Sequence, residues 1–206
     1  MNHDRGPLLV ASGDDLTLVR AEETEHERVT RLGYDEKTGE VCIDGVIDAE
    51  LGSWFAAVHR RLTHLGHDNV LVHLNTEGGD CQSMLMFCDT VRASQHPVTV
   101  RALGNVCSAG VLMLACADRR LVTRNCVMMI HQHASSGEGD GLRYQESKER
   151  RKWEDWLHTR MIELMAEYSG KEVSYWRRIL EKRPEHWLLG GHAIVEEGLA
   201  DEVVPY

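Results

Sequence analysis

Apolar and polar positions alternate in two different rhythms along the chain from Glu40 onward. Between Leu51 and Leu65 the apolar residues recur at spacings of three and four, which predicts an amphipathic helix that Asp48 caps and Gly66 ends. Short apolar runs between such stretches predict strands. The expected strands cover residues 40–44, 69–74, 98–103, 121–123, 127–130 and 202–204.

One of the expected helices is much longer than the others. The spacing of apolar residues predicts it from about residue 142 to 168, with Gly170 ending it. Shorter helices are expected at 84–93 and 106–117, and two more follow Gly170. Strands that alternate with helices through short loops predict an α/β fold with mostly parallel strands.

The long helix fits poorly into a compact doubly wound domain, so we expect it to project toward a neighbouring subunit. Its residues Trp153, Trp156, Met161 and Met165 are predicted to form an exposed apolar surface, which marks an interface. The alternative is that this stripe packs on its own domain, as amphipathic helices usually do.

The first 39 residues differ in composition from the rest of the chain. They are rich in Glu, Asp, Arg and Gly, and only Leu16–Val19 suggests a strand. We therefore interpret residues 1–39 as an N-terminal arm, predicted to be partly mobile, and residues 40–206 as one domain.

Composition narrows the class of protein. The chain has 206 residues, of which 42% are hydrophobic, and a formal net charge of −10, which argues against nucleic-acid binding. No apolar run is long enough for a membrane span, and the N-terminus does not resemble a signal peptide. The six cysteines form no C-x-x-C pair, which predicts reduced thiols, a cytoplasmic location and no disulfide framework.

Candidate chemistry begins at Ser108, in the stretch GNVCSAGVLMLAC of residues 104–116. Ser108 stands where a helix is expected to begin, so it is either a helix cap or a nucleophile whose developing charge the helix N-terminus would stabilise. A loop at 75–80 carries the pair Gly78-Gly79 after an expected strand. Its backbone N–H groups, with one beside Ser108, would suit an oxyanion hole, although a plain glycine turn is the alternative.

A histidine at the end of another expected strand supplies a possible base. The segment MMIHQH places His131 at the strand terminus and His133 on the same face. These two histidines would also suit a metal ion, but the sequence offers no third ligand, so no metal or other cofactor is predicted.

Taken together, these segments resemble the proteolytic subunit of the Clp protease family. The resemblance runs from about Glu40 to Val204, through LNTEGGD, a helix containing Cys88-Asp89-Thr90, GNVCSAGVLMLACA, VMMIHQH and EHWLLGGHAIVEEGLADEV. In the family the corresponding segments follow the same order: an SPGG loop, an Asp-Thr helix, an A-S-M-G nucleophile turn, an M-I-H-Q strand and a D-x-F-L segment.

The resemblance implies a fold, a site and an assembly. The fold would be a crotonase-like superhelix of βαβ units with a long projecting helix. Ser108 would be the nucleophile, His131 the general base, and the N–H groups of Gly79 and Ala109 the oxyanion hole. The protein would be a self-compartmentalising serine endopeptidase acting on peptides or unfolded proteins. Its partners would be further copies in stacked heptameric rings and an AAA+ unfoldase or adaptor.

Three positions depart from the family pattern. The catalytic aspartate of the family matches Glu185, with Glu181 and Asp201 as alternatives. The proline of the SPGG loop is Glu77 here, and the proline after M-I-H-Q is His133. Two other functions stay open at this point: a non-catalytic ring subunit that pairs with an active paralogue, and a crotonase-type acyl-CoA enzyme.

Overall fold

The computed structural model describes residues 8–12, 15–19, 33–132, 144–183 and 185–205. Near the N-terminus, β1 (Leu8–Ser12) and β2 (Asp15–Val19) pair antiparallel as a hairpin. The remaining strands form a single sheet of eight strands. They are β3 (Tyr34–Asp35), β4 (Glu40–Ile47), β5 (Val70–Gly79), β6 (Val98–Cys107), β7 (Arg119–Thr123), β8 (Val127–His131), β9 (Glu185–Leu189) and β10 (Glu202–Val204).

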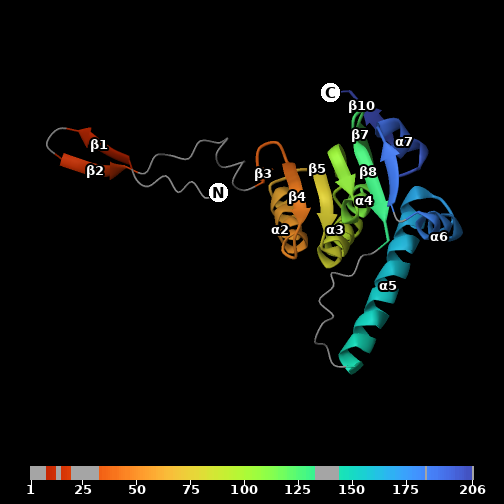
Figure 1. The fold of residues 1–206 in the computed structure, drawn as a ribbon. Helices are drawn as coiled ribbons and strands as arrows, with labels where there is room; N and C mark the ends of the chain where they lie inside the picture. Colours follow the sequence, from red (N-terminus) through yellow and green to blue (C-terminus); the bar gives the residue numbers. More distant parts are fainter. Residues whose placement is uncertain (1–7, 13–14, 20–32, 133–143, 184, 206) are drawn as a thin grey trace.

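The sheet forks at β6. The order β10-β7-β6-β5-β4-β3 makes one continuous path (Figure 1), in which only the β3–β4 pair is antiparallel. The first half of β6 pairs with β7, whereas Asn105–Cys107 pair in parallel with Val127–Met129 of β8. Strand β9 then pairs antiparallel with β8. The fork brings the ends of β6, β8 and β9 together.

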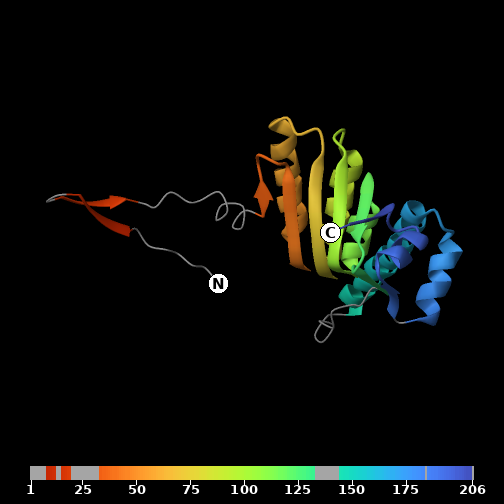
Figure 2. The same cartoon turned by 90° about the horizontal axis from the view of Figure 1, so that it is seen from above.

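Helices α2 (Leu51–His64), α3 (Cys81–Ala93) and α4 (Ala109–Ala115) lie against one face of the sheet (Figure 2). Strand β5 shows why: Val70, Val72 and Leu74 are fully buried, and the residues between them are only partly covered. The other helices are α5 (Tyr144–Ser169), α6 (Val173–Lys182) and α7 (Gly191–Glu196).

The observed elements confirm the mixed α/β prediction and correct several of its details. Strand β5 continues to Gly79, so the segment 75–79 is a strand rather than the expected loop. Residues 106 and 107 end β6, and the helix predicted at 106–117 is only Ala109–Ala115. Strand β9 is an element that the apolar pattern did not predict. Residues 134–141 are rich in glycine and serine, which predicts a loop, and they lie outside the described residues.

The long helix α5 extends beyond the sheet at its N-terminal end (Figure 1). Trp153 and Trp156 on this part are 40% and 55% exposed, as predicted. The same prediction is wrong for Met165, which is buried in its own domain, and for Met161, which packs against the core. Some apolar residues of α5 therefore pack into the domain, and others are exposed on the surface of the helix.

Candidate active site

Ser108 joins β6 to α4 through an unusual backbone conformation. Its φ is 54° and its ψ is −121°, and among the described residues it is the only non-glycine with positive φ. Its side chain makes no capping hydrogen bond, and its N–H donates to the Met129 carbonyl of β8 at 2.8 Å. Ser108 is therefore not acting as a helix cap. Strained backbone of this kind is concentrated at functional sites.

The side chain of Ser108 instead meets His131. The Nε2 atom of His131 lies 2.7 Å from the Ser108 Oγ atom. Cys107 pairs with Met129, so the β6–β8 register brings His131, two residues farther along β8, close to the turn at Ser108. The positive φ of Ser108 ends the strand alternation at this turn. Both side chains are partly buried. The distance is that of a short hydrogen bond, which is the geometry that a serine nucleophile and a histidine base would require.

Gly78 closes the site from the β5 side. An added Cβ at Gly78 would lie 2.6 Å from the Ser108 Cβ and 3.2 Å from the Ala109 backbone N. Gly79 lies against β4, where an added Cβ would be only 2.1 Å from the Ile47 carbonyl oxygen. Both positions therefore require glycine. Because Gly78 has no side chain, the end of β5 can lie against the start of α4. Ala109 begins α4, so its N–H has no partner within that helix.

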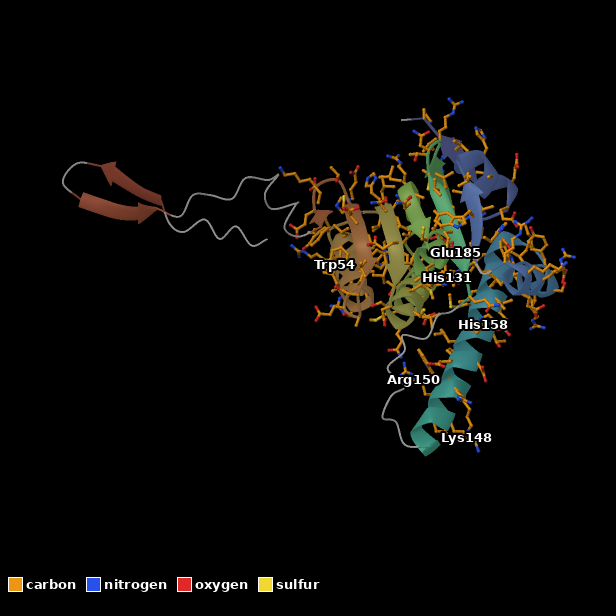
Figure 3. The ribbon with its side chains drawn as sticks, viewed as in Figure 1. Trp54, His131, Lys148, Arg150, His158 and Glu185 are labelled. Carbon is orange, nitrogen blue, oxygen red and sulfur yellow. The ribbon has the colours of Figure 1, made fainter. Side chains whose placement is uncertain are left out.

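Glu185 lies directly across from His131. The two residues are register partners in the antiparallel β8–β9 pair, so their side chains share one face of the sheet (Figure 3). The Glu185 carboxylate accepts a hydrogen bond from the Trp187 Nε1 atom at 2.9 Å. Among the described residues no hydrogen bond joins Glu185 to His131. The carboxylate is thus beside the base but bonded to the neighbouring indole.

Asp201, an alternative candidate for the acid, is engaged elsewhere. Its carboxylate binds the guanidinium and the backbone N–H of Arg120, whose side chain also donates to the Tyr168 and Gly198 carbonyls. Partial burial acts to raise the pKa of Asp201, but the hydrogen bonds from Arg120 outweigh it and the pKa is lowered. This ion pair connects β7 to the start of β10 and has a structural role.

An apolar pocket opens beside the Ser108–His131 pair. Helices α4, α5 and α6 and strand β8 contribute its walls, and the side chain of His158 also lines it. The apolar lining residues are Val111, Leu112, Ile130, Met161, Ile162, Met165 and Leu180. This pocket was not predicted from the sequence, because Met161 and Met165 were expected on an outer surface of the helix. The spacing of residues 158, 161, 162 and 165 places all four on one helical stripe, which was the available signal.

The cysteine next to Ser108 is not a competing nucleophile. Burial raises the pKa of the Cys107 thiol, with a smaller contribution from Glu77, so the reactive thiolate is disfavoured. All six cysteines lie in the described part of the chain, and none of them forms a disulfide. His133 lies outside the described residues, and within the described part of the chain no three metal-ligating side chains come together. No helix in that part combines the length and hydropathy needed to cross a bilayer.

A comparison with known protein families shows which family this chain belongs to. The model of the Clp protease family matches residues 34–206. The chain belongs to the Clp protease family. This result confirms the resemblance drawn from the sequence motifs. The matched region begins at β3, so it includes all eight strands of the main sheet.

The relatives within the Clp protease family are distant. The ATP-dependent Clp protease proteolytic subunit 1 of Bifidobacterium longum is 29% identical over 142 residues, 67% of this chain and 58% of the relative. The subunits of the same name from Salinibacter ruber and Rhodococcus jostii are 26% and 24% identical, over 65% and 67% of this chain and 55% and 61% of their own length. The matched part of this Clp family chain therefore spans less than two thirds of these relatives.

A solved structure confirms the fold. A point mutant of ClpP1 from Listeria monocytogenes superposes with a TM-score of 0.71, covering 87% of this chain and 96% of that one. The two sequences are 23% identical. The chain thus has the mixed α/β fold of the Clp proteolytic subunit.

Proposed function

We propose that this Clp family protein is a serine endopeptidase that hydrolyses peptide bonds through Ser108 and His131. The observation that carries the proposal is the 2.7 Å contact between Ser108 Oγ and His131 Nε2 at a strained turn. The apolar pocket beside this pair would receive a nonpolar substrate side chain and hold the scissile carbonyl near Ser108.

The reaction would proceed by acyl transfer. His131 takes the Ser108 proton as Oγ forms a bond to the peptide carbonyl carbon, and the carbonyl oxygen becomes an oxyanion. The N–H groups of Gly79 and Ala109 are proposed to donate to this oxyanion. His131 then gives its proton to the leaving amine as the C–N bond breaks. A water molecule, deprotonated by His131, releases the acyl group and restores Ser108.

Glu185 is proposed as the acid that orients His131 and stabilises its charged form. The support is its register position directly opposite His131 on β9. Members of the family typically form oligomeric rings. We propose that this chain forms stacked heptameric rings and works with an AAA+ unfoldase or adaptor. The exposed Trp153 and Trp156 on α5 support an interface at that helix.

A fluorophosphonate probe tests the proposed chemistry, because it reacts with an activated serine. We expect labelling at Ser108 in the wild-type protein, and none in the Ser108→Ala variant, which removes only the Oγ atom. The variant should keep its fold and assembly while losing hydrolysis of a fluorogenic peptide by several powers of ten. An unlabelled Ser108 would support a non-catalytic ring subunit or an acyl-CoA enzyme instead.

A further inference from the structure

The face of β9 that carries the proposed acid also carries an indole donor. Glu185 and Trp187 are two residues apart on one strand, so both side chains project on the same side as His131. Trp187 pairs in register with Met129, and Glu185 pairs with His131. The Trp187 indole is 48% exposed, and its Nε1 atom lies 2.9 Å from the Glu185 Oε2 atom.

Two donors therefore lie within reach of one carboxylate, and Trp187 is the donor that is bonded to it. Cross-strand partners have Cβ atoms about 4.5–5.5 Å apart, which puts the His131 ring within reach of a glutamate side chain at 185. Residues two apart along a strand are separated by about 6.5 Å, and the long glutamate side chain reaches Trp187 as well. An indole N–H is a donor and never an acceptor, so it favours a carboxylate that stays beside it. His131 uses Nε2 toward Ser108, and its other ring nitrogen faces no described hydrogen-bond partner.

We infer that Trp187 is a positioning residue that holds the Glu185 carboxylate along β9 and off His131, so that the Ser108–His131–Glu185 triad closes only when the indole N–H releases it. This inference rests on the proposed function, and it adds control of the acid to that function. The device requires a glutamate and a tryptophan two residues apart, a combination that the family pattern D-x-F-L does not contain.

The Trp187→Phe variant tests this directly, because phenylalanine keeps an aromatic side chain and removes the N–H. With one hydrogen bond lost, the population of the closed triad should rise, and kcat for a small fluorogenic peptide should increase about fivefold, equivalent to about 1 kcal/mol. KM should stay nearly unchanged, because the proposed substrate pocket is lined by residues of α4, α5, α6 and β8, and no residue of β9 lines it. Leu189→Ala is the matched control: Leu189 is on the same face of β9, is 73% exposed, and makes no contact that the mechanism uses.

A structural measurement tests the inference without relying on an activity assay. A crystal structure of Trp187→Phe combined with Ser108→Ala should place a Glu185 carboxylate oxygen about 2.6–3.2 Å from a ring nitrogen of His131. Ser108→Ala alone should keep the carboxylate on Trp187. If Trp187→Phe folds poorly, Trp187→Leu removes the same N–H and should give the same carboxylate movement.

The outcomes separate the two proposals. A kcat at or below wild type in Trp187→Phe, with Leu189→Ala at wild type, would overturn the positioning role and make Trp187 a support of the acid. A carboxylate that stays off His131 in the double variant would overturn it as well. If the fluorophosphonate probe leaves Ser108 unlabelled, the proposed function fails, yet the crystal structures still decide whether Trp187 holds Glu185.

Discussion

Replacing Gly78 with alanine should disable the site by moving Ser108. An added Cβ would lie 2.6 Å from the Ser108 Cβ and 2.8 Å from the Cys107 carbonyl oxygen, both on the turn that holds the nucleophile. Carbon atoms pack best at about 3.5–4.0 Å, so this turn and β5 must separate by about 1 Å. The φ of Gly78 is also +98°, a conformation that an alanine adopts only with strain.

The magnitude follows from these two effects. Backbone strain contributes about 1–3 kcal/mol of lost stability. The shift of about 1 Å at Ser108 lowers the rate by about 10²-fold, because catalysis depends on near-attack geometry. Gly66→Ala separates the two effects: the φ of Gly66 is +97°, but no atom lies within 4 Å of an added Cβ. Gly66→Ala should lose a comparable amount of stability through backbone strain and keep full activity.

Urea denaturation measures the stability of both variants, and a fluorogenic peptide together with fluorophosphonate labelling measures the site. We expect Gly66→Ala to lose stability alone, and Gly78→Ala to lose stability, hydrolysis and labelling rate. The reasoning is wrong if Gly78→Ala labels and cleaves like Gly66→Ala, since the close approach of β5 to Ser108 would then have no role in the reaction.

Four further predictions address other parts of the molecule. Glu185→Gln should lower kcat by up to about 10⁴-fold with little change in KM, and a wild-type rate would leave a Ser108–His131 dyad. Burial, with Arg183 adding to it, lowers the pKa of His186, so the unfolded chain binds a proton that the folded chain does not, and stability should fall as pH drops through about 6.5. His186→Phe should flatten this dependence in urea titrations at pH 7 and pH 5. Asp201→Asn should lose up to about 1 kcal/mol at pH 7, because it weakens the Arg120 ion pair, which solvent screens at the 41% exposed Asp201 side chain. That difference should begin to shrink below about pH 4, near the pKa of an unfolded Asp, and should disappear only at lower pH, where the folded carboxylate, whose pKa is lowered, becomes protonated as well. Trp153→Ser with Trp156→Ser should reduce the mass measured by light scattering, whereas an unchanged mass would place the interface elsewhere.

The sequence predicted the fold better than the details of the site. Period-two burial in β5 and the helical stripe of α2 are local signals, and both are visible in the order of residues. Ser108 and His131 stood out because each follows an apolar strand. Their 2.7 Å contact depends on the β6–β8 register, which no local pattern encodes.

The parts that were missed depend on tertiary structure. The five residues EHWLL of β9 are too short and polar to stand out, and they form a strand because β8 offers an edge for pairing. Segment 75–79 contains turn-forming residues, yet pairing with β4 and β6 keeps most of it extended. The hydrogen bond between Trp187 and Glu185 could not be predicted either, because it depends on both residues lying on one face of a strand.

The place of β9 near the end of the chain also sets the order in which the parts of the site can come together during synthesis. Ser108 and His131, which are 23 positions apart in the chain, are both in place once β6 and β8 have paired in parallel. The carboxylate enters only after α5 and α6 have been synthesised and β9 has returned antiparallel to the exposed edge of β8. A chain still emerging from the ribosome would therefore hold the proposed nucleophile and base without the proposed acid. The order of synthesis would delay the completion of the proposed triad until nearly the whole domain exists.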